Sequence, residues 1–328
     1  MTVMIESVQA HAEQRERASR AELAIRIAQV VRTDGSAEPI PGLHLHRVSR
    51  INESTHSVYV PSFCVIAQGS KEIALGERSY HYDAEHFLLV TVELPFTGRI
   101  VEASWDRPYL CLNLDLDPAL VGSVMVEAGL LVPRGHTDAK GLVVSALDAD
   151  LLDAALRLMR LIDTPAHANV LVPLVKREII FRLLQGEQGR RLRHFPLLSV
   201  NAHPIARAIE RLRQEFNRPL RIERIAQEVG MSASGFHHHF KSITDMSPLQ
   251  FQKQLRLQEA RRLMLGEDMD VASAGIRVGY NDASQFSREY KKHFGTAPAR
   301  DVERLRATLG GEPQHVRLLG PQHYDGMP

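Results

Sequence analysis

Residues 221–241 read RIERIAQEVGMSASGFHHHFK, and the same pattern returns in altered form in residues 270–291 as DVASAGIRVGYNDASQFSREYK. Gly230 matches Gly279 at an offset of 49 residues and Phe236 matches Phe286 at an offset of 50, so the second copy has one extra residue in its turn. An internal repeat of this kind indicates one structural unit that is used twice.

Each copy predicts a short helix, a glycine that tolerates positive φ at the end of that helix, a polar N-cap and a second helix. The N-cap is Ser232 in the first copy and Asn281 or Asp282 in the second. Two helix-turn-helix motifs are therefore predicted, at about residues 221–242 and 270–292.

In each predicted second helix, an aromatic pair four residues apart marks the buried face. The opposite face carries hydrogen-bond donors that can reach base edges and phosphates, so these side chains are candidate DNA contacts. They are Ser234, His237, His238 and Lys241 in the first copy, and Ser284, Ser287, Arg288 and Lys291 in the second. A helical protein that uses the motifs only for packing or protein interactions, without DNA, is the alternative.

The net charge of the whole chain does not suggest a nucleic-acid partner, but the charge of its C-terminal third does. The 328 residues carry a formal net charge of +1, but residues 198–308 hold 18 Lys and Arg against 13 Asp and Glu. The other residues hold 22 against 26 and are acidic. This basic excess is typical of DNA binding and also of an ordinary solvated surface. Charge alone therefore does not distinguish the two, and the sequence motifs are needed to do so.

The doublet resembles the DNA-binding domain of the AraC/XylS family of bacterial transcription regulators. The shared pattern includes IA and VGMS within residues 225–232, FK at 240–241 and MSP at 246–248, with VGY at 278–280 and FGTAP at 294–298. The resemblance implies an all-α domain of seven helices over 200–308, with helices at 201–216, 249–265 and 298–307 among them. It also implies that recognition helices at about 233–242 and 282–293 enter successive major-groove segments of a double-stranded operator, ~34 Å apart.

The first recognition helix departs from the family pattern. The run His237-His238-His239 stands where relatives often carry an arginine near position 238. Because histidine is mostly neutral near pH 7, we expect modest and pH-sensitive attraction to phosphates there.

Upstream of this domain, residues 38–117 predict short strands broken by turn-forming Pro and Gly, after an amphipathic helix within residues 1–36. In 109–116, leucines alternate with Tyr, Cys, Asn and Asp, as in a strand with a buried face. The segments PSFCVIAQGSK (61–71), YDAEHFLLV (82–90) and LPFTG (94–98) resemble the N-terminal domain of one subgroup of the same family. This resemblance implies a cupin-like β-barrel sensor over 37–120 with flanking helices, and an α+β fold for the chain.

A sensor barrel implies a small-molecule effector. Cys64, Tyr82, His86 and Glu102 are the candidate ligand-binding residues. Cys64 has two interpretations: a small buried core residue, or a reactive thiol that senses an aldehyde, another electrophile or a redox change.

The competing function is a cupin-type metalloenzyme fused to a DNA-binding domain. His44 and His46, two residues apart on one strand, supply two candidate ligands. Metal cupins carry a glutamate four or five positions after such a pair, whereas Glu53 follows His46 by seven. The chain also shows no nucleophile elbow, phosphate-binding glycine loop or dinucleotide fingerprint. We therefore expect no enzyme activity, no metal and no cofactor.

Residues 121–190 are predicted to be a helical dimerisation or transmission region with a hairpin at 148–186, residues 190–200 a linker, and 309–328 a flexible tail. The chain has only two cysteines, no apolar stretch of about 18 residues and a charged N-terminus. These features predict a cytoplasmic protein without a membrane partner.

The combined prediction is a homodimeric, effector-controlled regulator that binds operator DNA, with RNA polymerase as a further candidate partner.

Overall fold

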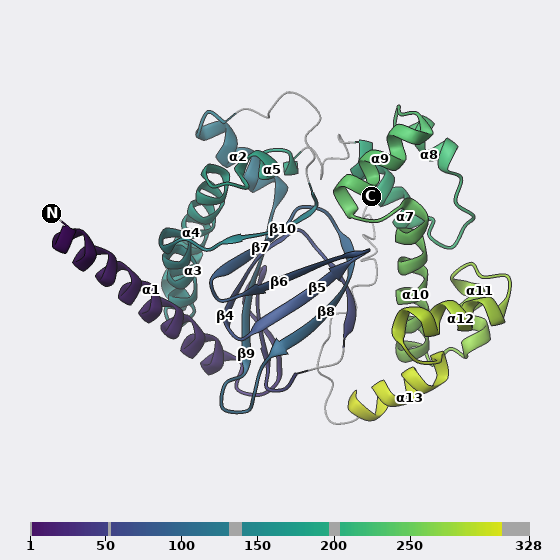
Figure 1. Ribbon diagram of the computed structural model, residues 1–328, viewed down its shortest axis with the longest axis horizontal. Coiled ribbons are helices and arrows are strands. Elements are labelled where there is room, and N and C mark those ends of the chain that lie inside the picture. Colours follow the sequence, from purple (N-terminus) through teal and green to yellow (C-terminus); the bar gives the residue numbers. More distant parts are fainter. Residues whose placement is uncertain (1, 52–53, 131–139, 197–203, 310–328) are drawn as a thin grey trace.

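The computed structural model describes residues 2–51, 54–130, 140–196 and 204–309. A β-rich part lies in the middle of the molecule, with helices from residues 2–30 and 118–192 on one side of it and the helical C-terminal part on the other (Figure 1). No helix in these four ranges is both long and apolar enough to cross a membrane.

Ten strands form two antiparallel sheets in the part of the chain that the structure describes. The six-stranded sheet has the order β1 (Gly35–Ile40), β2 (Leu43–Val48), β9 (Tyr109–Asp115), β4 (Ser62–Gln68), β7 (His86–Val90) and β10 (Leu142–Ala146). The four-stranded sheet has the order β3 (Thr55–Tyr59), β8 (Leu94–Glu102), β5 (Ser70–Leu75) and β6 (Arg78–Asp83). The expected α+β class and cupin-like β domain are confirmed, with the strands in two separate sheets and not in one closed barrel.

Strand β9 shows how the alternation in the sequence is used. Leu110, Leu112 and Leu114 point toward the helices and join their core. Tyr109 and Cys111 point the other way, into the space between the sheets, and are also buried. Both faces are buried because helices cover the outer face of the six-stranded sheet and the second sheet covers its inner face.

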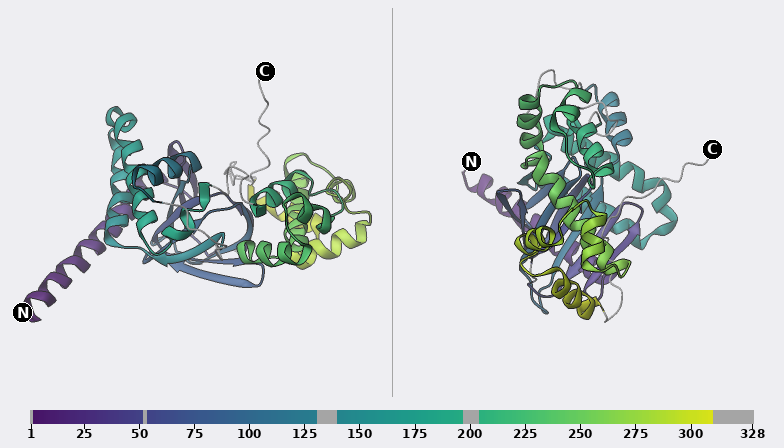
Figure 2. Two further views of the ribbon diagram at one scale, coloured as in Figure 1. Left: turned by 90° about the horizontal axis from the view of Figure 1, so that it is seen from above. Right: turned by 90° about the vertical axis from the view of Figure 1, so that its right-hand side faces the viewer.

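The helices beside the six-stranded sheet are α1 (Thr2–Val30), α2 (Pro118–Glu127), α3 (Ala149–Arg160), a 3-10 turn (Leu161–Asp163), α4 (Pro165–Gln185) and α5 (Gly189–Leu192). The first part of α1 extends away from the body (Figures 1 and 2). Leu23 and Ile27, near the other end of α1, are fully buried in the helix-facing core. The hairpin of α3 and α4 lies where the sequence predicts one.

The region 121–190, predicted to be helical, differs in one respect because strand β10 lies inside it. β10 pairs with β7 at the edge of the six-stranded sheet, with Leu142 opposite Val90. Its sequence LVVSA is a short apolar run, and periodicity alone does not distinguish a helix from a strand in such a run. Residues 197–203 of the predicted linker and 310–328 of the predicted tail lie outside the described residues.

The C-terminal part contains seven helices within residues 204–309, as the family resemblance implies. They are α7 (Pro204–Gln214), α8 (Ile222–Glu228), α9 (Ala233–Thr244), α10 (Pro248–Gly266), α11 (Val271–Arg277), α12 (Ala283–Phe294) and α13 (Pro298–Leu309). Helices α8 and α9 form the first helix-turn-helix unit, α11 and α12 form the second, and α10 joins the two (Figure 1).

The two units differ in how they pack against the rest of the molecule. Phe236 and Phe240 of α9 belong to a cluster of buried side chains that continues into the space between the sheets. Phe286 and Tyr290 of α12 belong to a separate cluster made of C-terminal helices alone. The first unit is therefore built onto the β domain, whereas the second has a core of its own.

Candidate nucleic-acid interface

The turn of each unit depends on a glycine with positive φ. Gly230 has a φ of +74° and Gly279 a φ of +92°, a conformation that residues with a Cβ avoid. At Gly279 a Cβ would also lie 2.0 Å from the carbonyl oxygen of Asn217. The side chains of Ser232 and Asp282 accept hydrogen bonds from backbone N–H groups in the first turns of α9 and α12. The predicted turn chemistry is present in both copies.

The outer face of α9 carries the predicted DNA-contacting residues of the first unit. Ser234, His237, His238 and Lys241 are all exposed. The aromatic pair on the opposite face is fully buried, and its two rings lie 5.5 Å apart. Helix α9 is therefore anchored on one side and leaves its other side free to enter a groove.

Helix α12 presents the second set of predicted residues. Ser284, Arg288 and Lys291 are exposed and Ser287 is half-buried. The Nε of Arg288 donates to the carbonyl oxygen of Ser284 at 3.3 Å, and within the described residues Arg288 forms no ion pair. Its guanidinium therefore keeps donors available for a partner outside the chain.

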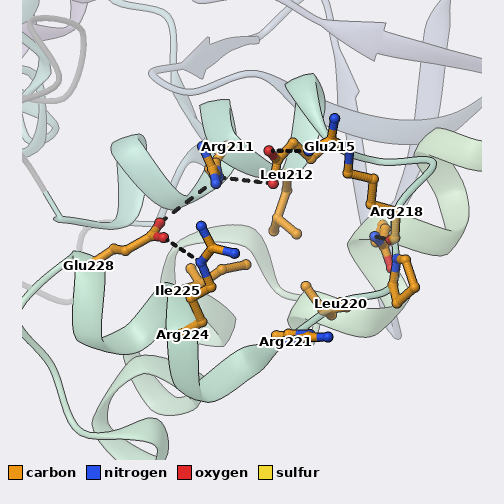
Figure 3. Close-up of a pocket in the computed structure, with 11 residues that line it drawn as sticks. Arg211, Leu212, Glu215, Arg218, Leu220, Arg221, Arg224, Ile225 and Glu228 are labelled. Carbon is orange, nitrogen blue, oxygen red and sulfur yellow. Dashed lines mark hydrogen bonds and ion pairs between the residues drawn. The ribbon is translucent and has the colours of Figure 1, made fainter.

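A basic cavity of about 300 Å³ lies beside the first unit, between α7, α8 and the loop that joins them (Figure 3). Its charged lining residues are Arg211, Arg218, Arg221, Arg224, Glu215 and Glu228. Arg211 pairs with Glu215 at 3.0 Å, and Arg224 pairs with Glu228 at 2.9 Å. Arg221 forms no ion pair with any described residue, so its charge is available to an approaching phosphate. This cluster was not predicted from the sequence, because it lies outside the recognition helices; the arginines at 211, 213, 218, 221 and 224 are the signal that could have revealed it.

A second cavity, of about 360 Å³, lies at the matching place in the second unit. At the offset of 49 residues, Met269 and Asp270 in its lining are the counterparts of Leu220 and Arg221. Its charged lining residues are Asp268, Asp270, Glu303 and Arg306. The repeat has therefore diverged in charge, and attraction of phosphate outside the recognition helices favours the first unit.

The histidines that were weighed as metal ligands have other partners. The Nε2 of His44 lies 3.1 Å from a carboxylate oxygen of Asp115, and the Nε2 of His46 lies 3.3 Å from the amide nitrogen of Asn113. Glu53 lies outside the described residues. Within the ranges that the structure covers, no three His, Cys, Asp or Glu side chains form a group that could hold a metal ion.

Two of the four predicted ligand-binding residues meet between the sheets. Cys64 and Tyr82 are fully buried in the same cluster. His86 is half-buried with its Nδ1 2.8 Å from Asp83, and Glu102 is exposed at the end of β8, so both lie at the margin of this space. Burial raises the pKa of the Cys64 thiol to about 12. These surroundings favour a core residue over a reactive thiolate.

Lys71 reaches into this space and was not predicted from the sequence. It lies on the same face of β5 as Ile73, and its Nζ donates to the hydroxyl of Tyr59 at 3.1 Å. The Nζ also lies 5.3 Å and 5.1 Å from the ring centroids of Tyr59 and Phe96, within the range of cation–π contacts. Burial lowers the pKa of Lys71, and no described carboxylate forms an ion pair with it. The two-residue period of β5 was the signal that could have placed this lysine inside.

Comparisons with known proteins agree with this architecture. A family model for the AraC-type transcriptional regulator N-terminus matches residues 39–191, and a helix-turn-helix domain model matches residues 225–304. The chain is 33% identical over 100 residues to the MmsAB operon regulatory protein of Pseudomonas aeruginosa, which is 30% of this chain and 33% of that protein. It is 26% identical over 144 residues to the HTH-type transcriptional regulator ArgR of the same organism, which is 43% of each chain. The chain thus spans less than half the length of these two relatives.

Two more distant similarities extend over most of the chain. The virulence regulon transcriptional activator VirF of Yersinia enterocolitica is 22% identical over 253 residues, 75% of this chain and 90% of that protein. Among solved structures, ToxT from Vibrio cholerae O395 superposes with a TM-score of 0.52 and 12% identity, covering 80% of this chain and 98% of that chain. At this identity the second similarity concerns the fold alone.

Proposed function

Because the chain belongs to the AraC/XylS family of bacterial transcription regulators, we propose that it regulates transcription by binding operator DNA through α9 and α12. The observation that carries this proposal is the repeated geometry of the two helices. Each buries an aromatic pair and exposes hydrogen-bond donors on its opposite face. Helices presented in this way read base edges from the major groove.

The outward side chains divide by chemistry into two roles in this proposal. Bases are read by Arg288 and by the hydroxyl and imidazole groups of Ser234, His237, His238, Ser284 and Ser287. Lys241 and Lys291 hold phosphates as point charges, and Arg221 in the basic cavity supplies a further phosphate contact.

We do not extend the proposal to catalysis. The relatives described above are regulators by name, which favours regulation over the alternative of a cupin-type metalloenzyme fused to a DNA-binding domain. Since the operator is chromosomal DNA, we place the protein in the cytoplasm, and we propose RNA polymerase as a second partner of the bound regulator.

An effector is proposed to bind between the two sheets, with Cys64 and Tyr82 in the interior and His86 and Glu102 at its margin. A half-buried ammonium without a carboxylate partner is costly, so Lys71 favours an effector that carries a negative charge. The ToxT structure with the similar fold is bound to (E)-4-(8-methylnaphthalen-1-yl)but-3-enoic acid, which is a carboxylic acid. Native mass spectrometry should find an anionic small molecule on the purified wild-type chain and not on Lys71→Met. The same anion retained by both would contradict the role of Lys71.

A homodimer is proposed on the surface of α4. This helix exposes four large apolar side chains, which are Val170, Leu171, Leu174 and Phe181. Three of them, Leu171, Leu174 and Phe181, follow helical spacing and form an apolar row that a second copy of the chain can cover. Such a dimer would place two pairs of recognition helices on one operator.

The DNA proposal is tested by a gel shift of the full chain with the region upstream of its own gene. We expect a complex that weakens steeply as salt rises, because the basic side chains displace counterions from phosphates. The double variant Lys241→Ala/Lys291→Ala should show a shallower salt dependence. A wild-type chain that forms no complex at low salt would overturn the proposal.

A further inference from the structure

The β domain contacts both recognition helices at equivalent ends. The C-terminal end of α9 meets β6, and the C-terminal end of α12 meets β3. Strands β6 and β3 are the two edge strands of the four-stranded sheet. Four adjacent strands span about 14 Å between the edges, at the usual spacing of ~4.8 Å. The sheet therefore contacts both helix-turn-helix units, one at each of its two edges.

At the first unit the contact is centred on Asp245, the C-cap residue of α9. The hydroxyl of Tyr80 donates to one carboxylate oxygen of Asp245 at 2.5 Å, and the guanidinium of Arg78 lies 3.3 Å from the other. The β5–β6 turn packs so closely that a Cβ on Gly76 would lie 2.4 Å from the carbonyl oxygen of Asp245. The backbone N–H of Gly141 also donates to the carbonyl oxygen of Ile243 at 2.7 Å, which satisfies one of the free carbonyls at the helix end.

The backbone conformation and the charge of Asp245 are both unfavourable at the C-terminal end of a helix. It has a φ of +55°, where its counterpart in the second unit is Gly295 with a φ of +79°. A residue with a Cβ is strained in this region, and a negative charge at a helix C-terminus opposes the helix dipole. The side chain is only 6% exposed. Its two partners on β6 are what offset these costs, so the residue serves the contact with the β domain and not the helix.

At the second unit the contact is aromatic. The ring of His56 on β3 lies 4.5 Å from that of His293 and 4.6 Å from that of Phe294, centroid to centroid. The Nδ1 of His56 lies 2.9 Å from the hydroxyl of Thr97 on the neighbouring strand β8, which holds the ring in place. The amide of Gln258 on α10 adds a hydrogen bond to the carbonyl oxygen of Ser57 at 3.1 Å.

We propose that the four-stranded sheet sets the separation and relative orientation of the two recognition helices, and that Asp245 is the positioning residue that holds α9 to it. This inference rests on the proposed DNA-binding function. Helices of this kind contact bases mainly with their N-terminal residues, and docking at the C-terminal ends leaves those residues free.

The same contact gives a route from the effector to DNA. Tyr80 and Tyr82 lie two residues apart on β6 and therefore on one face of the strand. Tyr82 lines the proposed effector site and Tyr80 holds Asp245. An effector that displaces β6 changes the position of α9 relative to α12, and so changes the operator geometry that the protein prefers.

Hydrogen exchange of the full chain without DNA tests the contact itself. Asp245→Gly removes the carboxylate while suiting the positive φ, and Tyr80→Phe removes only the donor. Both should raise exchange at the amides of Gly141 and of the β5–β6 turn by at least about fivefold, the lower end of typical coupling energies. Asp245→Asn keeps an acceptor and tolerates positive φ, so it should stay close to wild type. Asp268→Gly is the matched control, because Asp268 also has positive φ, at +53°, but its side chain is 86% exposed.

Spacing preference on DNA tests the positioning role. One base pair inserted between the two footprinted segments should weaken wild-type binding by at least about fivefold. Asp245→Gly and Tyr80→Phe should lose less affinity on this insertion, because α9 is held less firmly at its distance from α12. Asp268→Gly and Asp245→Asn should behave like wild type.

Two results would overturn the inference. Unchanged exchange in both Asp245→Gly and Tyr80→Phe would show that the contact does not hold the first unit. Increased exchange with an unchanged spacing preference would show a contact that stabilises without positioning. A wild-type chain that binds no DNA would overturn the proposed function and the positioning role together, while the exchange measurements would still report on the contact.

Discussion

Arg288 and His238 occupy the same position in the two recognition helices, fifty residues apart. A guanidinium carries a permanent charge and five donors, whereas a neutral imidazole offers one donor and one acceptor. Both side chains are exposed on helices that bury an aromatic pair at matching positions. The two units therefore share a fold and differ in what they can read, and we expect the second unit to supply more of the base specificity.

We predict that Arg288→Ala weakens operator binding by about 1–3 kcal/mol and relaxes preference at one base pair, as the loss of a bidentate guanine contact does. A gel shift on operators that differ at single positions measures both effects. Arg107→Ala is the matched control, since Arg107 is exposed in the β8–β9 connection of the β domain. An unchanged footprint and affinity for Arg288→Ala would remove this residue from the interface.

At the scale of elements, the second unit is held together by its own small core. Phe286 of α12 is fully buried between Tyr280 and Tyr290, with ring centroids 5.3 Å and 5.6 Å away. Gly275 of α11 lies so close that a Cβ there would be 3.0 Å from the Phe286 ring. The close approach of α11 to α12 thus depends on a pair of residues, one large and one without a side chain.

We predict that Phe286→Ala lowers the unfolding free energy of the second unit by about 3–5 kcal/mol, the usual cost of such a cavity. Hydrogen exchange should rise in α11 and α12 and stay unchanged in the β domain and α9, because the two cores are separate. Gln285→Ala, at the exposed neighbouring position, should have little effect. An equal rise in α9 would mean that the units unfold together.

For the whole molecule, the junction of the β domain with the second unit is sensitive to acid. Burial, with the nearby charges of His293 and Arg261, lowers the pKa of His56 to about 3. Burial and the charge of Arg261 lower the pKa of His293 to about 4. Asp301 acts on His56 in the opposite direction. Both rings are therefore docked in their neutral form.

When the contact opens, the two histidines return to their ordinary pKa of 6.5. Below that pH the open state binds protons that the docked state does not, so acid favours opening. We predict that stability conferred by this junction is complete above about pH 6.5 and is lost progressively toward pH 4. Thermal unfolding midpoints measured across this range report the loss. His56→Phe keeps a ring that cannot be protonated and should flatten the dependence, whereas His167→Phe, at an exposed site on α4, should leave it unchanged.

Much of the C-terminal part could be predicted because its determinants are local. Positive φ at Gly230 and Gly279, the caps at Ser232 and Asp282 and the spacing of the aromatic pairs act within a few residues of one another. Strand β10 and Lys71 were missed for the opposite reason. A short, mostly apolar run becomes a strand only when a neighbour such as β7 pairs with it, and a lysine is partly enclosed only when a second sheet packs over it.

Consecutive residues of the sequence carry the helix periodicity and turn chemistry that predict two helix-turn-helix units and the residues that each unit exposes. The same residues carry the resemblance to the AraC/XylS family. How the two units are held relative to each other follows from tertiary contacts. The contacts of Asp245 with Tyr80 and of His293 with His56 join residues more than 160 positions apart. Sequence periodicity does not reveal such long-range contacts, since they depend on how separately folded surfaces pack together.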